Sequence, residues 1–140
     1  MEKFTDFWCF RLNTLSRKIS RKYNSKCLEY GITAPQSFVL FDLLDHEGSN
    51  VKDIAARVQL DSSAVTGVID RLYKEELVKR EEDPTDRRSL NIFLTPKGRK
   101  LAENLFPTGR EFNLYLRSLL EADKAEQFEE LLKAIDDKVQ

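Results

Sequence analysis

The feature that most constrains this sequence is a change in the spacing of its apolar residues near position 76. Before that point apolar residues recur every three or four positions, the period of an amphipathic helix. Beyond it, residues 77–82 and 90–95 alternate between apolar and polar, with Leu90, Ile92 and Leu94 on one face, as in strands with one buried side. Because the polar segment 83–89 links the two strands, they are predicted to form a hairpin with a charged tip.

Short helices with clear starting signals precede this hairpin. Thr33 and Gln36 have the spacing of a capping box, which opens a helix that continues to about residue 45. Asn50 is expected to cap a helix over residues 51–58, and Asp61 the next one, through about residue 75. Only Gln59 and Leu60 remain for the turn between them. Two short helices, a tight turn and a hairpin predict a winged helix-turn-helix.

Longer helices flank this central part. A helix is predicted over residues 5–30, with Gly31 as its stop, and another over 96–120, capped by Thr95. The last helix, 123–139, is predicted to open with a capping box of Asp123 and Glu126. The predicted fold is therefore mainly α with a small β-hairpin wing, in a single domain of residues 1–140.

Composition narrows the class of protein. With 140 residues, 41% hydrophobic and 34% charged, the chain has the size and balance of one globular domain. No apolar run approaches the roughly 20 residues of a membrane span, and no signal peptide is recognisable, so we expect a soluble cytoplasmic protein with no membrane partner. The net charge of −1 argues against indiscriminate binding of polyanions. Residues 51–100, with eleven basic and nine acidic side chains, leave room for a local basic patch.

Nothing in the sequence indicates an enzyme. His46 is the only histidine and stands between Asp45 and Glu47 at a predicted helix end. The sequence has no glycine-rich phosphate loop and no set of a nucleophile with its base. Cys9 and Cys27 are too few and too far apart for a metal site or a disulfide framework. We therefore expect no catalytic residue, no metal and no cofactor.

The central part carries side chains suited to DNA. Small polar residues at the start of helix 61–75 match the entry of a helix into the major groove, although the serines there would also assist Asp61 in capping. Arg87 and Arg88 at the hairpin end suit the negative potential of a narrow minor groove, with Asp86 holding one of them in place. The predicted DNA-binding residues are Ser62, Ser63, Ala64, Thr66, Arg71, Lys74, Asp86, Arg87 and Arg88.

Two strings and the order of the elements resemble the MarR family of transcriptional regulators. The strings are DIAARVQLDSSAVTGVIDRL, residues 53–72, and DPTDRRSLNIFLTPKG, residues 83–98. The resemblance implies a homodimer that binds a pseudo-palindromic operator in double-stranded DNA, usually as a repressor released by a signal. It also implies that residues 1–32 and 96–140 form dimerisation helices around a DNA-binding lobe of residues 33–95.

The chain departs from the family pattern at two positions. Glu76 stands where the family usually has glycine, so the helix before it is expected to lack a left-handed glycine cap. Gly67 stands where a larger, often basic, residue is common, which removes one possible DNA contact.

The resemblance suggests two signals, and the residues leave both open. Cys9 matches the reactive cysteine of the OhrR-type branch, which organic hydroperoxides oxidise, and Tyr23 matches a tyrosine that hydrogen-bonds its thiolate there. Fourteen residues of helix span about 21 Å, so such a contact requires a dimer. Asn13 replaces that branch's second tyrosine, and a free cysteine is more commonly a packing residue.

The other signal is a small phenolic or aromatic effector between the dimerisation helices and the DNA-binding lobe. Aromatic residues at helical spacing are candidates for such a pocket, although they also suit a plain core: Trp8, Phe10, Tyr30, Phe38 and Phe41. A winged-helix protein-interaction module that does not bind DNA remains the alternative function, because acidic residues such as Glu81 and Glu82 lie beside the wing.

Overall fold

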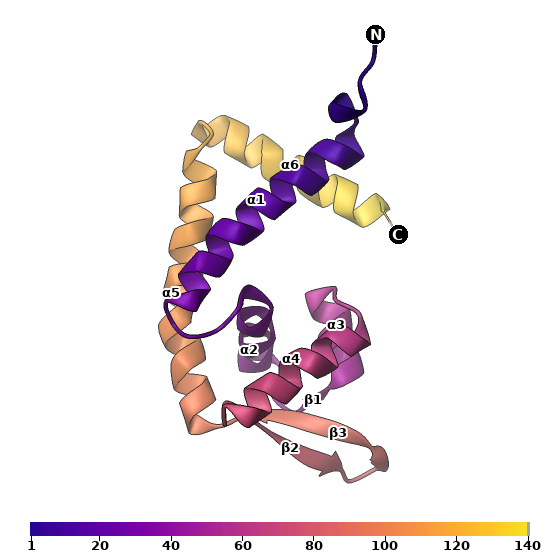
Figure 1. Cartoon of the computed structure of the whole chain (residues 1–140), viewed down its shortest axis with the longest axis vertical. Helices are drawn as coiled ribbons and strands as arrows, with labels where there is room; N and C mark the ends of the chain where they lie inside the picture. The colour runs from indigo at the N-terminus through magenta and orange to yellow at the C-terminus, as the bar shows by residue number, and fades with distance from the viewer. Residues whose placement is uncertain (140) are drawn as a thin grey trace. The chain divides into compact units, whose positions relative to one another are not determined.

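The computed structural model describes residues 1–139 and confirms the winged helix-turn-helix (Figure 1). Two compact units divide the chain, Met1–Phe106 and Pro107–Gln140, and each is treated by itself. A 3-10 turn, η1 (Phe4–Asp6), precedes α1 (Trp8–Leu28). The predicted first helix is therefore broken at Phe7, whose extended backbone separates the two.

The central lobe follows the predicted order. Its elements are α2 (Ala34–Asp45), β1 (Ser49–Asn50), α3 (Val51–Val58), α4 (Ser62–Lys74), β2 (Val78–Asp83) and β3 (Asp86–Leu94). The capping box of Thr33 and Gln36 is present, and Asn50 and Asp61 cap α3 and α4 through their side chains, as predicted. The sheet has the order β1-β3-β2 and is antiparallel throughout.

The hairpin is longer than predicted. Its strands pair from Val78 opposite Leu94 out to Asp83 opposite Asp86, so only Pro84 and Thr85 remain in the turn. The polar turn predicted over residues 83–89 is therefore shorter in the structure, because Asp83 pairs with Asp86. The register shifts between Glu82 and Asp83, so Arg87, Arg88 and Ser89 lie in an irregular stretch of β3 between the paired residues Asp86 and Leu90. Ile92 and Leu94 are buried as expected, whereas Leu90, near the tip, is 40% exposed.

Two helices complete the chain. α5 (Pro96–Ser118) begins as predicted, with the Thr95 hydroxyl oxygen accepting the amide of Gly98 at 3.0 Å. α6 (Ala122–Lys138) begins one residue earlier than predicted, after Glu121, and no side chain caps it. The capping box of Asp123 and Glu126 was therefore wrong, because Asp123 already lies inside the first turn.

The core of the first unit lies where α2, α3 and α4 meet the sheet (Figure 1). Burial of each large aliphatic side chain there contributes about 1.5–3 kcal/mol relative to its exposure. Fully buried members include Leu40, Leu43, Ile54, Val65, Leu72 and Ile92.

α4 ends in a Schellman motif with a glutamate at the left-handed position. The amide of Leu77 donates to the carbonyl of Leu72 at 2.9 Å, and that of Glu76 to the carbonyl of Tyr73 at 3.0 Å. Glu76 itself has φ of 61°, which is costly for any residue with a Cβ. α4 thus ends in the left-handed conformation that a glycine at this position would adopt, but with backbone strain because the residue is Glu76.

A buried hydroxyl pair joins α1 to α2. The Ser37 hydroxyl donates to the carbonyl of Ala34 at 2.6 Å, so the Tyr23 hydroxyl, 2.7 Å from it, must be the donor to Ser37. The Tyr23 ring also stacks on Phe38, with centroids 5.4 Å apart. Burial raises the pKa of Tyr23 to about 12, and the neighbouring Cys27 adds to this rise.

We expect Glu76→Gly to raise the free energy of unfolding by about 0.5–1 kcal/mol, because glycine adopts positive φ without a Cβ clash. Urea unfolding at one protein concentration measures this. Glu75→Gly is the matched control, since φ at Glu75 is −85° and glycine there should only destabilise. A loss of stability with Glu76→Gly would contradict the assignment of strain.

We expect folding stability to fall as the pH rises from about 10 to about 12, because the unfolded chain releases the Tyr23 proton before the folded chain does. The contribution is complete below about pH 10. Titration of phenolate absorbance should show a late-ionising group that Tyr23→Phe removes. An unchanged titration curve in that variant would show that Tyr23 is not the buried phenol.

Candidate nucleic-acid interface

α4 presents one face to the core and the other outward. Val65, Val68, Ile69 and Leu72 are buried, so the remaining positions face away from the lobe. The predicted contact residues on this helix are all exposed: Ser62, Ser63, Ala64, Thr66, Arg71 and Lys74. The placement agrees with a helix that can enter a groove.

Hydrogen bonds at the start of α4 occupy some of these hydroxyls. The Asp61 carboxylate accepts from the amide of Ala64 at 2.8 Å and from the Ser63 hydroxyl at 2.7 Å, and both bonds hold the pKa of Asp61 below its usual value. Thr66 donates to the carbonyl of Ser62 at 2.8 Å. Ser63 therefore assists the cap in this structure, while the Ser62 hydroxyl has no protein partner within residues 1–139.

The hairpin turn is held by its own aspartates. Asp83 accepts from the amide and the hydroxyl of Thr85, at 2.9 and 2.7 Å, and these bonds lower the pKa of Asp83. Asp86 accepts from the backbone amide of Arg88 at 3.0 Å. Asp86 thus holds the backbone of Arg88 in place, and no ion pair between Asp86 and either arginine is present among residues 1–139.

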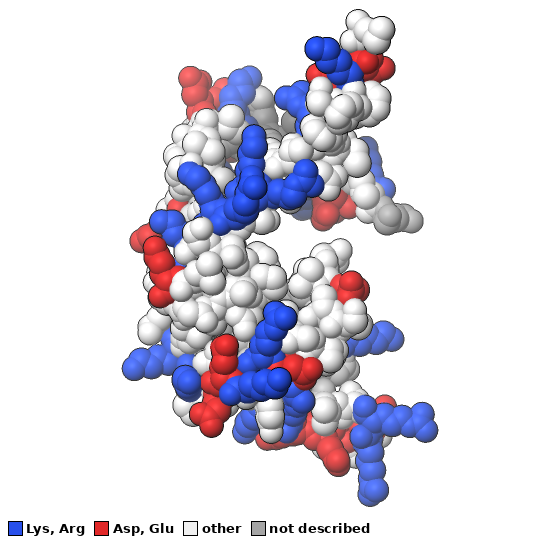
Figure 2. All heavy atoms as spheres, viewed as in Figure 1, with Lys and Arg blue, Asp and Glu red and all other residues white. Residues whose placement is uncertain are grey.

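Two cations remain available at the wing. Arg87 and Arg88 are exposed and take part in no ion pair with any of residues 1–139. Figure 2 shows basic side chains reaching outward from the end of the hairpin. Nearby acidic charge is partly neutralised, since Glu81 pairs with Lys79 at 3.3 Å.

An ion pair that was not predicted fixes the first helix of the motif. Arg57 of α3 makes a bidentate contact with Asp42 of α2, at 2.8 and 2.9 Å, and also donates to the Ser49 hydroxyl at 2.6 Å. Asp42 keeps the pKa of Arg57 above its usual value. The contact joins residues fifteen positions apart, so no local spacing signals it.

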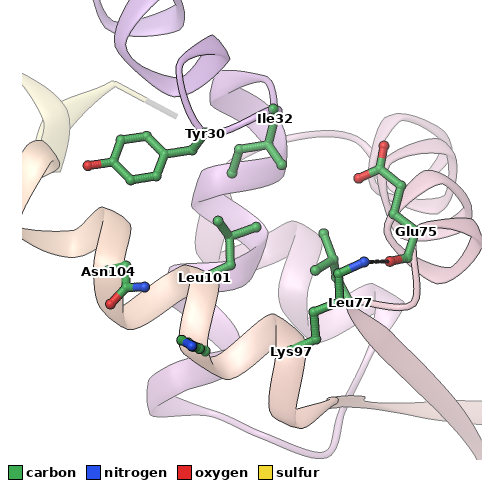
Figure 3. A pocket seen from close by; sticks show the side chains of 9 residues that line it. Tyr30, Ile32, Glu75, Leu77, Lys97, Leu101 and Asn104 are labelled. Carbon is green, nitrogen blue, oxygen red and sulfur yellow. Dashed lines mark hydrogen bonds between the residues drawn. The ribbon is translucent and has the colours of Figure 1, made fainter.

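α4 is the second helix of the helix-turn-helix and hence its recognition helix. A groove of about 420 Å³ lies beside its end, between the α1–α2 connection, the end of α4 and the first turns of α5 (Figure 3). Its walls are apolar at Ile32, Leu77 and Leu101, and Lys97 and Lys100 supply positive charge. Lys97 Nζ donates to the carbonyl of Glu75, the last residue before the α4 stop, at 3.1 Å (Figure 3).

Most of the aromatic residues predicted to line an effector pocket do not line this groove. Only Tyr30 lines this groove. Phe38 stacks on Tyr23, Phe41 packs edge-to-face on Phe106, and Phe10 does so on Phe4. Trp8 is 76% exposed. Phe10, Phe38 and Phe41 thus take part in three separate ring contacts of the first unit, and the predicted effector pocket stays a prediction.

The two residues of the predicted redox site lie far apart along α1. Cys9 is exposed in its first turn, with Asn13 Nδ2 at 3.5 Å from the sulfur. Tyr23 is buried near the other end, where its hydroxyl is bonded to Ser37. Within residues 1–139 no group of three His, Cys, Asp or Glu is placed to hold a metal ion, and no helix there is long and apolar enough to cross a membrane.

Comparison with known proteins agrees with this geometry. The model of the MarR family matches residues 32–90. The HTH-type transcriptional regulator TtmR of Methylorubrum extorquens is 39% identical over 93 residues, 66% of this chain and 48% of TtmR. The regulator MgrA of Staphylococcus aureus is 34% identical over 98 residues, 69% of this chain and 67% of MgrA. The chain thus spans about half of TtmR and two thirds of MgrA.

Solved structures extend the likeness to nearly the whole chain. The S. aureus MepR–DNA complex matches 95% of this chain and 98% of MepR, with a TM-score of 0.88 and 27% identity. BpsR of Bordetella bronchiseptica, whose DNA binding is regulated by 6-hydroxynicotinic acid, matches 98% of both chains, with a TM-score of 0.89 and 26% identity. The chain belongs to the MarR family of winged helix-turn-helix transcriptional regulators.

Proposed function

We propose that this chain is a homodimeric transcriptional regulator that binds a pseudo-palindromic operator and represses from it. The observation that carries the proposal is that Arg87 and Arg88 are exposed, with no ion-pair partner among residues 1–139, on the same lobe as the exposed start of α4. The similarity to MepR in its complex with DNA supports it. Since the target is DNA, we place the protein in the cytoplasm.

Each lobe would read one half-site. The start of α4 would enter the major groove, with Ser62, Ala64 and Thr66 near base edges and Arg71 and Lys74 near phosphates. Arg88, held by Asp86, would enter the adjacent minor groove beside Arg87. Two such lobes in a dimer match half-sites about one turn of DNA apart.

Exposed apolar side chains support a dimer through the terminal helices. In the first unit, Phe7, Trp8, Leu12 and Leu15 are 47–76% exposed. In the second, α6 exposes an apolar face of Phe128, Leu131, Leu132 and Ile135, and Val139, which follows the helix, is exposed as well. Faces of this kind mark protein interfaces, and a second copy covers both kinds at once.

Of the two candidate signals, binding of a small molecule in the groove of Figure 3 has more support than oxidation of Cys9. An aromatic carboxylate would place its ring on Leu77 and Leu101 and its charge near Lys97 and Lys100. Drawing Lys97 away from Glu75 would disturb the end of the recognition helix.

Oxidation at Cys9 is the second candidate signal. A hydroperoxide would convert the thiolate to a sulfenate and would itself be reduced to the alcohol.

We expect Arg88→Ala to weaken binding to a duplex selected by the wild-type protein by about tenfold, with a shallower salt dependence. Fluorescence anisotropy at several salt concentrations measures both. Lys124→Ala, on α6 of the second unit, removes an equal charge outside the helix-turn-helix and the wing and serves as the control. Equal affinity for wild type and Arg88→Ala would remove the wing from the mechanism, and failure of the wild type to select any duplex would favour a protein-interaction module.

Two treatments, each with its own variant as control, distinguish the two candidate signals. We expect 6-hydroxynicotinate, used as a probe carboxylate, to release DNA from the wild type and less so from Lys100→Met, because the groove loses a cation. Cumene hydroperoxide with Cys9→Ser as control tests the oxidative route. Release by hydroperoxide from the wild type alone would assign the signal to Cys9, whereas equal release from Lys100→Met by the carboxylate would exclude the groove.

A further inference from the structure

One side-chain cluster, centred on Arg80, joins the recognition helix directly to the wing. Arg80 lies on β2 opposite Ile92, on the same face of the strand as the buried Val78. Its guanidinium pairs with Asp70 and lies over the ring of Tyr73, with 4.4 Å from the guanidinium carbon to the ring centroid. Both of these partners belong to α4.

Asp70 and Tyr73 anchor the Arg80 guanidinium to α4. Its Nε is buried and has no hydrogen-bond partner in the described part of the chain, and its side chain is only 28% exposed. A planar guanidinium that both stacks and pairs has little rotational freedom left. The side chain therefore acts as a short brace between strand and helix, beyond the edge of the apolar core.

The neighbouring cation on the same strand has no such role. Lys79 points to the other face of β2, where it pairs with Glu81 at 3.3 Å and lies 5.7 Å from the ring centroid of Phe93 on β3. Its contacts stay within the hairpin. Lys79 thus offers the same charge at nearly the same place without a link to α4.

We infer that Arg80 is a positioning residue that sets the wing against the recognition helix, so that Arg88 reaches its groove when α4 occupies the next one. This inference rests on the proposed DNA-binding function. Arg80 acts through Asp70 and Tyr73, and it does not itself contact DNA.

Asp70→Asn gives a test whose sign separates the explanations. If charge alone mattered, removing an acid from the DNA-facing helix and freeing Arg80 would strengthen DNA binding. If Arg80 is a brace, Asp70→Asn should weaken binding about fivefold or more, as should Arg80→Met, since both release the wing. Lys79→Met should show only the smaller loss of one peripheral charge. Tighter binding by Asp70→Asn would overturn the inference.

A double-mutant cycle with Arg88→Ala supplies the second arm. If Arg80 acts only by positioning Arg88, it has nothing left to position in the Arg88→Ala variant. Adding Arg80→Met to that variant should then lower the affinity for DNA little further. Fully additive losses would show that Arg80 works independently of the wing and would also overturn the inference.

Amide hydrogen exchange keeps the test independent of DNA. Asp70→Asn should speed exchange in β2 and β3 relative to the wild type and to Lys79→Met, while α2 stays protected. Unchanged exchange in the hairpin would contradict the brace even if DNA binding is normal. If the wild type selects no duplex but the hairpin loosens, the proposed function fails and the brace stands.

Discussion

Leu77 is the residue through which the recognition helix, the wing and α5 are held together. Its amide donates to the carbonyl of Leu72, which ends α4, and its carbonyl accepts from the amide of Thr95 at 3.1 Å. The first turn of α5 packs so closely on it that a Cβ at Gly98 would lie 1.9 Å from the Leu77 oxygen. Because three elements meet at one residue, a movement of the first turn of α5 would act on α4 and β2 together.

In the proposed function, this junction would link a ligand in the neighbouring groove to DNA binding. Glu75 and Leu77 form part of the groove wall, and Lys97 bonds to the carbonyl of Glu75. An anion bound to Lys97 would act on the end of the recognition helix itself. The Arg80 brace completes the arrangement from the other side, since it ties the wing to the same helix.

Capping residues and apolar spacing predicted most helices and strands. They did not predict features that depend on an unusual backbone conformation or on a partner far away in the sequence. Gly31, with φ of 78°, correctly indicated the end of α1. Gln59 and Glu76 adopt the same left-handed conformation, but neither is a glycine, so their residue type does not indicate it. Apolar residues that follow the stops, such as Ile32 and Leu77, secure them by burial, which spacing alone does not show. The ion pair of Asp42 with Arg57 links separate helices and left no trace in the sequence.

The most direct measurement is hydroxyl-radical footprinting of the wild-type protein on a duplex that it selects from random sequence. A dimer that reads the major groove with α4 and the minor groove with the wing should protect two stretches centred about 10 base pairs apart, related by the symmetry of the site. Protection of a single stretch, or protection that ignores the sequence of the duplex, would contradict the account.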